Sequence, residues 1–141
     1  MPKTQSGAEP SPDGRWVAYV SDETGRAEVY VRSSSGSSEQ WQISTSGGAQ
    51  PRWRGDAREL FFATPDGKVM ATPIETQPSF RPGTPKPLFT LPEPPNRLLP
   101  LFEDVTPDGN RFLLNLPTES AASVGFRVVL HWRALISDHT P

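Results

Sequence analysis

The pattern Ser/Thr-Pro-Asp-Gly occurs three times in this chain, at residues 11–14, 64–67 and 106–109. The glycine that closes such a pattern can take the left-handed backbone conformation that a tight turn needs. The first copy follows GAEP and the third follows FEDV, and an apolar run comes after each of them. The middle copy lies between two apolar runs, and it is therefore interpreted as a hairpin turn inside a repeat.

The stretch that matches the first and third copies in the middle of the chain is GAQPRWRG, residues 48–55. Its last glycine, Gly55, is aligned with Gly14 and Gly109, so that repeats start near residues 7, 48 and 102. A period of about 40–55 residues with four short strands per repeat is typical of propeller blades.

Short runs rich in Val, Tyr, Trp and Phe alternate along the chain with turn-forming clusters of Gly, Asp and Ser. The runs are RWVAYVS (15–21), AEVYVR (27–32), EQWQIS (39–44), ELFFAT (59–64), KVMATPI (68–74), PLFTL (87–91), RFLLNL (111–116) and FRVVLHW (126–132). The chain has 17 prolines and 11 glycines, and the prolines lie between the apolar runs. The sequence thus predicts an all-β protein.

We expect one domain over residues 1–141, a half-propeller of three four-stranded blades. The predicted blades cover about residues 7–46, 47–95 and 96–137, by the repeat period. The last of them is short by one strand, because no clear fourth run follows residues 126–132. Residues 1–6 could supply that outer strand across the junction, or the edge could stay open.

Composition limits the possible partners. The formal net charge is -2, from 14 Lys and Arg against 16 Asp and Glu, which argues against a nucleic-acid partner. No run of apolar residues is long enough to insert in a membrane, and no signal peptide is visible in MPKTQSGAEP. The chain has no cysteine. Because no segment is apolar enough to insert in a membrane, we expect a soluble protein, and the cell compartment stays open.

Four stretches carry a resemblance to a known family. SPDGRWVAYVSDETGRAEVYV and GGAQPRWRGDARELFFATPDGKVMATPI, with DVTPDGNRFLLNLP and VVLHWRAL, resemble TolB-type β-propeller repeats. They look most like the closing blades of the propeller sensor regions attached to some bacterial serine/threonine kinases. The resemblance implies a six- or eight-bladed module that binds proteins, peptides or small ligands. This chain departs from that pattern because it holds three blades and no kinase.

The number of blades predicts an assembly. Three blades alone would leave two large apolar faces in water, which a monomer rarely does. Two copies around a two-fold axis would close a six-bladed ring. We therefore expect a homodimer, and the alternative is a fragment with no defined assembly.

Aligned on the turn glycines, Glu9, Gln50 and Asp104 each lie five residues before Gly14, Gly55 and Gly109. The innermost strand of a blade runs beside the central channel, so these side chains are expected to line it. Four carboxylates converge there in a dimer, and either their pKa values rise or a cation lies among them. Oxygen ligands alone favour Ca²⁺ or Mg²⁺. The alternative is a solvated ring with no ion.

Two classes of function remain. The first is a propeller binding module with a metal-binding channel and no organic cofactor. The second is a metal-dependent hydrolase of phosphotriesters, lactones or activated esters, with Glu9 and Asp104 as candidate catalytic residues. Arg52 and Trp53 follow the inner strand near a channel mouth and could contact a ligand, although core packing is the alternative for Trp53. Whether the protein is an enzyme stays open.

Overall fold

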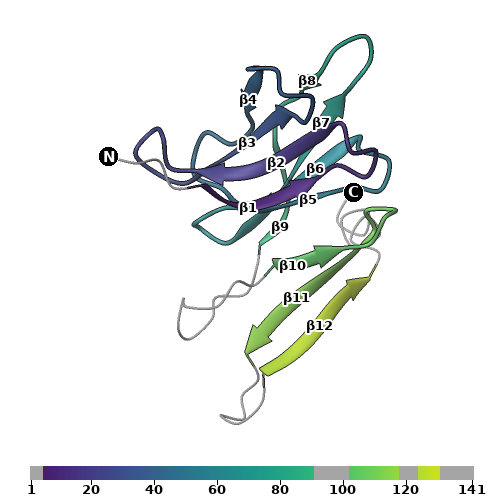
Figure 1. Cartoon of the computed structure of the whole chain (residues 1–141). Coiled ribbons are helices and arrows are strands. Elements are labelled where there is room, and N and C mark those ends of the chain that lie inside the picture. The colour runs from purple at the N-terminus through teal and green to yellow at the C-terminus, as the bar shows by residue number, and fades with distance from the viewer. Residues whose placement is uncertain (1–4, 91–101, 118–123, 131–141) are drawn as a thin grey trace, which may run out of the picture.

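The structure is a computed structural model that describes residues 5–90, 102–117 and 124–130. The described residues form strands and turns and no helix (Figure 1), which confirms the predicted all-β class. The strands are β1 (Gln5–Pro10), β2 (Trp16–Ser21), β3 (Glu28–Ser33), β4 (Gln40–Gln42), β5 (Ala49–Trp53), β6 (Glu59–Ala63), β7 (Lys68–Glu75), β8 (Arg81–Pro82), β9 (Lys86–Thr90), β10 (Phe102–Val105), β11 (Arg111–Pro117) and β12 (Val124–Leu130).

The strands make three antiparallel sheets that follow the chain order (Figure 1). The first sheet is β1-β2-β3-β4 and the third is β10-β11-β12. In the second sheet, β5-β6-β7, both β8 and β9 pair with β7, so that together they form an interrupted fourth strand. Sheets built from consecutive strands are what the blade prediction requires. We call the sheets blades 1, 2 and 3.

The same kind of turn joins the first two strands in blade 1 and in blade 3. Gly14 donates its N–H to the carbonyl of Ser11 at 2.8 Å, and Gly109 does the same to Thr106 at 2.8 Å. Both glycines have a φ of 73°, in the left-handed region where glycine has no steric cost. The middle Thr-Pro-Asp-Gly copy connects β6 to β7, as predicted. Its turn is one residue shorter than the other two, because the N–H of Thr64 donates to the carbonyl of Lys68 at 2.9 Å.

In blade 2 the left-handed turn residue is Ala57, with a φ of 61°, and not Gly55. Ala57 donates its N–H to the carbonyl of Arg54 at 2.9 Å, as the turn glycines do in the other blades. The sequence alignment on Gly55 was therefore wrong by two residues. Gly55 is needed for a different reason: an added Cβ would lie 2.8 Å from the Cβ of Pro107 in the turn of blade 3.

Two apolar cores join the blades. Alternate side chains of β2 and β6 pack between blades 1 and 2, because successive residues of a strand point to opposite faces. Phe61 and Val69 point the other way and pack on Phe112 and Leu114 of blade 3. Phe61 and Trp53 are both buried, with exposed fractions of 0% and 8%.

The proline-rich stretch 74–89 is partly buried. Its Phe80 is 5% exposed and lies against two tryptophans of blade 1, with ring centroids 4.7 Å from Trp16 and 4.4 Å from Trp41. This contact fastens the outer part of blade 2 to blade 1. The burial of Phe80 depends on partners that are distant in sequence.

The face of blade 1 that points away from blade 2 carries aromatic rings with polar groups around them. Tyr19 and Tyr30 stack at 5.7 Å, and the Arg32 guanidinium lies 5.3 Å from the centre of the Tyr19 ring. The two tyrosines are 4% and 3% exposed. These two rings therefore expose little of their surface.

Residues 5 and 6 belong to blade 1. Gln5 pairs with Ser21 and Ser6 with Val20 in β1 and β2. They are thus not available as the outer strand of blade 3, and residues 1–4 lie outside the described part of the chain. Nor do the described residues contain any helix of the length and apolarity that crossing a lipid bilayer demands.

Candidate functional site

The innermost strands β1, β5 and β10 each place one charged residue at the same position relative to their neighbouring strand. The backbone partners are Glu9 with Ala18, Arg52 with Phe61, and Asp104 with Leu113. Each charged residue comes two positions before the residue that opens the turn. Arg52, and not Gln50, is therefore the structural equivalent of Glu9 and Asp104.

A bulge precedes this position in every inner strand. The pairing shifts between Ser6 and Glu9, between Ala49 and Arg52, and between Phe102 and Asp104. Bulges redirect a side chain and are frequent next to functional sites. The shared bulge gives the three charged residues a common backbone setting, and we call them the inner-strand triad.

The structure brings two members of the triad together. Arg52 Nη1 lies 3.2 Å from Glu9 Oε1, across the boundary between blades 1 and 2. The side chains are 23% and 38% exposed, so the pair adds little to stability. The same Arg52 nitrogen donates to the carbonyl of Pro51 at 2.8 Å. Glu9, predicted as a metal ligand, thus has a guanidinium as its neighbour.

Asp104 lies on β10, which contacts β5 at the inner side of blade 3. The residue is exposed, and its Oδ1 accepts a hydrogen bond of 2.8 Å from the N–H of Val105. One carboxylate oxygen of Asp104 therefore supports the local backbone of the strand.

Gln50 lies two positions before Arg52, at the bulge. Its φ is 55°, and the equivalent residue of blade 1 is Gly7 with a φ of 64°. The left-handed conformation costs a non-glycine residue about 1–2 kcal/mol. Gln50 is half-buried.

Trp53 points into the core and away from the solvent. Its ring belongs to the apolar cluster between blades 1 and 2, and its Nε1 donates to the carbonyl of Glu9 at 2.9 Å. The side chain therefore links blade 2 to the inner strand of blade 1. This arrangement matches the packing alternative for Trp53, and ligand contact by this residue stays an untested prediction.

The turns carry aspartates that sequence reasoning did not single out. The hydroxyl of Ser11 donates to Asp13 and lowers the pKa of that carboxyl, and Thr106 does the same to Asp108. In Asp56, partial burial raises the pKa, and hydrogen bonds from Arg54 and Arg58 outweigh it, so that the pKa is lowered. These aspartates stabilise the turns as ionised groups.

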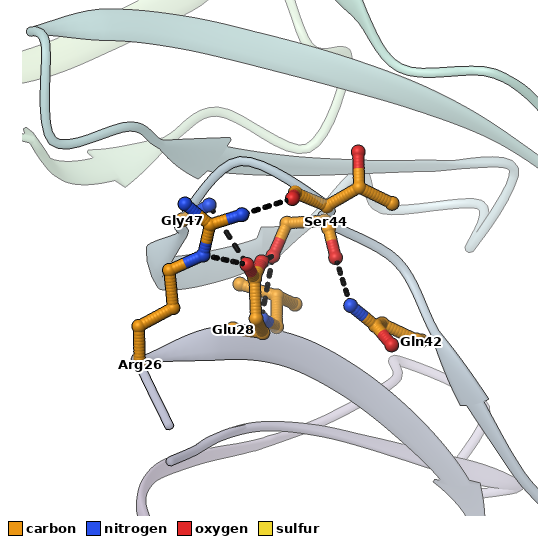
Figure 2. A network of polar contacts seen from close by, with 7 residues as sticks. Arg26, Glu28, Gln42, Ser44 and Gly47 are labelled. Atoms are coloured by element: carbon orange, nitrogen blue, oxygen red, sulfur yellow. Dashed lines mark hydrogen bonds and ion pairs between the residues drawn. The ribbon is translucent and has the colours of Figure 1, made fainter. Parts of the chain in front are cut away.

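A buried carboxylate holds the connection between blades 1 and 2 (Figure 2). Glu28 is 1% exposed and accepts hydrogen bonds from Ser44 Oγ and from Gly47 N at 2.9 Å. Arg26 Nε donates to it at 2.9 Å. Ser44 Oγ also accepts from the N–H of Val29 at 2.8 Å. The network fixes the residues that lead into β5.

The described residues include no group of three or more His, Cys, Asp or Glu side chains arranged to hold a metal ion. The predicted cation site needs Glu9, Gln50 and Asp104 from two copies of the chain. It therefore stays a prediction, with Ca²⁺ or Mg²⁺ as the expected ion.

No family model and no curated protein matches this sequence. Solved structures do match its fold. TolB from Acinetobacter baumannii superposes with a TM-score of 0.57 at 20% identity, over 91% of this chain and 30% of that one. An oligogalacturonate lyase from Vibrio parahaemolyticus gives 0.54 at 14% identity, over 94% and 29%. A structure from a study of two prolyl endopeptidases gives 0.58 at 16%, over 91% and 22%.

These likenesses define the class of the fold. The chain has a β-propeller-like fold, and TolB is among the proteins that it resembles. The chain spans less than a third of the length of each of these proteins, so their activities are not carried over.

Proposed function

We propose that this chain is part of a β-propeller binding module whose ligand lies against β1, β5 and β10. The observation that carries the proposal is the inner-strand triad: Glu9, Arg52 and Asp104 occupy one register position, each after a bulge. Three separate strands direct a charged side chain from the same level of the blade. A site of this kind can fix the orientation of a small polar ligand.

The charge of the triad favours a cation. Glu9 and Asp104 carry two negative charges and Arg52 carries one positive charge, so one copy of the triad has a net charge of -1. The guanidinium of Arg52 already lies beside Glu9. A bound cation would be attracted by the carboxylate of Asp104 and by the carboxylate oxygen of Glu9 that does not pair with Arg52. Ca²⁺ and Mg²⁺ remain the ions that oxygen ligands prefer.

Titration calorimetry tests this proposal with Ca²⁺, Mg²⁺, Mn²⁺ and Zn²⁺ on the wild-type chain and on the double variant Glu9→Gln, Asp104→Asn. The wild type is expected to bind, and the double variant is expected to lose binding because both carboxylates become neutral amides. An ion that binds only the folded protein also raises its unfolding temperature. No binding by wild type, or equal binding by both proteins, contradicts the cation site.

A hydrolase that uses such an ion is the second class of function. No described residue favours it over binding, and the comparisons show the fold alone. Its test is simple: hydrolysis of an activated ester that requires added metal and disappears in the double variant would support it.

A further inference from the structure

We propose that Asp66 is a site of spontaneous isomerisation, at which the main chain comes to run through the side-chain carboxyl of the aspartate. This inference is independent of the proposed function. It starts from the three Pro-Asp-Gly turns, which play no part in the cation proposal. An aspartate followed by glycine is especially prone to this reaction, because glycine has no Cβ to obstruct the approach of its nitrogen.

The reaction needs no reagent other than water. The backbone nitrogen of Gly67 attacks Cγ of Asp66 and closes a cyclic imide, and the carboxyl oxygen leaves as water with the proton of the Gly67 N–H. Water then opens the ring. Attack at the side-chain carbonyl restores aspartate, whereas attack at the backbone carbonyl breaks the original C–N bond and leaves isoaspartate. No atom is gained or lost overall.

All three turns restrain the reacting atoms by two shared contacts. The N–H of the glycine donates to the carbonyl three residues earlier, at 2.8 Å in Gly14 and Gly109 and at 3.0 Å in Gly67. The hydroxyl that opens each turn donates to the aspartate carboxylate and lowers its pKa. An ionised carboxylate is a poor target for a nitrogen nucleophile. These contacts slow the reaction at every turn and do not separate the three.

The turns at Asp13 and Asp108 hold the carboxylate by a further bond. The N–H of Arg15 donates to Asp13 Oδ1 at 3.2 Å, and the N–H of Asn110 donates to Asp108 Oδ1 at 3.0 Å. Each donor is the residue that follows the glycine. Because this bond ties the carboxylate to the backbone beyond the glycine, it opposes the rotation that would bring Cγ to the glycine nitrogen.

The turn at Asp66 is one residue shorter and lacks the residue that makes this bond. The N–H that follows Gly67 belongs to Lys68, and it donates to Thr64 Oγ1 at 3.0 Å instead. The ammonium of Lys68 lies 3.6 Å from Asp66 Oδ2, but the two side chains are 47% and 64% exposed, so this ion pair restrains the carboxylate little. Asp66 therefore keeps the hydroxyl of Thr64 as its main restraint.

The turn that contains Asp66 lies against the connection between blades 1 and 2. An added Cβ on Gly47 would lie 2.5 Å from Cγ of Pro65, so the proline ring packs directly on that glycine. The N–H of Gly47 in turn donates to the buried carboxylate of Glu28. Isoaspartate adds a methylene to the main chain next to Pro65. We expect it to loosen this contact and to lower the unfolding temperature.

The experiment follows isoaspartate at the three turns while the whole chain is kept in warm neutral buffer, either folded or unfolded in urea. Peptide mapping with mass spectrometry separates each isoaspartate peptide from the aspartate form of equal mass. In the folded chain, isomerisation at Asp66 is expected to be about fivefold faster than at Asp13 or Asp108, the rate equivalent of one hydrogen bond. In urea the three rates are expected to be similar, because each aspartate follows proline and precedes glycine.

Variants test the cause. Thr64→Val removes the hydroxyl, and isomerisation at Asp66 in the folded chain is expected to rise by about a further fivefold, with no change in urea. Thr106→Val is the matched control: the Asn110 bond remains, so Asp108 is expected to react more slowly there than Asp66 does in Thr64→Val. Asp66→Glu cannot close the same ring. Its unfolding temperature is expected to persist during incubation while that of wild type falls.

Isomerisation at Asp66 that is no faster than at the other two turns of the folded chain overturns the proposal. The same ranking in urea also overturns it, because the difference would then come from the local sequence and not from the fold. Both comparisons use the wild-type chain, so they are decisive even where a variant fails to fold. An equal fall of the unfolding temperature in incubated wild type and Asp66→Glu would overturn the inferred effect on the connection between the blades.

Discussion

The indole Nε1 of Trp53 donates a hydrogen bond of 2.9 Å to the backbone carbonyl of Glu9, from the inner strand of blade 2 to that of blade 1. The next residue back, Arg52, forms an ion pair with the Glu9 side chain. Two successive residues of β5 thus hold the backbone and the carboxylate of a single residue of β1. The inner-strand triad is therefore coupled directly to the packing between blades.

Trp53→Phe tests this coupling. The change keeps an aromatic ring in the core and removes the donor to Glu9. We expect a loss of about 1 kcal/mol in the free energy of unfolding, the usual value of one hydrogen bond, measured in denaturant. Because position 9 would be held less firmly, ligand affinity should fall as well. An unchanged free energy would show that the bond is not maintained in solution.

Phe61→Ala tests the core between blades 2 and 3. Phe61 is fully buried and meets Phe112 edge to face at 5.2 Å. We expect the variant to lose about 3–5 kcal/mol, as large-to-small changes in cores do. Chemical denaturation provides the measurement, and a loss below about 1 kcal/mol would mean that the two blades do not pack as the structure has them.

Glu28→Ala tests the buried network. The change leaves Ser44 and the N–H of Gly47 without their acceptor, at about 1–3 kcal/mol for each buried group. Arg26→Ala is the comparison, because Glu28 keeps its donors from Ser44 and Gly47 in that variant, so it should lose less than Glu28→Ala. Similar losses in the two variants would argue against a structural role for the carboxylate.

The turn aspartates predict a dependence on acid. The pKa of Asp13, Asp56, Asp66 and Asp108 is lowered in the folded chain from the ordinary 3.8. Stability from a lowered pKa is fully present above the unfolded value and is lost as the pH falls through the folded one. We expect the unfolding free energy to be flat from pH 7 to about 5 and to fall below pH 4.

Asp13→Asn combined with Asp108→Asn is the control for acid unfolding. The double variant should be less stable than wild type at pH 7 and should lose less on acidification, because two titrating groups are gone. Parallel curves for the two proteins between pH 5 and 2.5 would assign acid unfolding to other groups.

We expect the chain to form a dimer that closes the ring. The solved structures that it matches are more than three times its length, consistent with propellers that have further blades. Light scattering coupled to size exclusion should give twice the mass of one chain at micromolar concentration. A monomer with a cooperative melt would contradict closure by a second copy.

The amino-acid sequence by itself determined the strands, the turns and the repeat. Runs such as WVAYV and ELFFA are apolar on both faces, and Gly14, Gly67 and Gly109 mark left-handed turn positions. These features depend on residues next to one another in the chain, so they could be predicted, and with them the propeller class of the fold.

The tertiary structure alone decided which residues meet. Gly55 looked like a turn glycine, yet the left-handed residue is Ala57, and Gly55 is required by its approach to Pro107. That shift of two residues puts Arg52 beside Glu9 and gives Gln50 a different place at the bulge. Phe80 and Glu28 became buried through partners far away in sequence. Long-range contacts of this kind depend on how the blades pack, and local pattern carries no information on them.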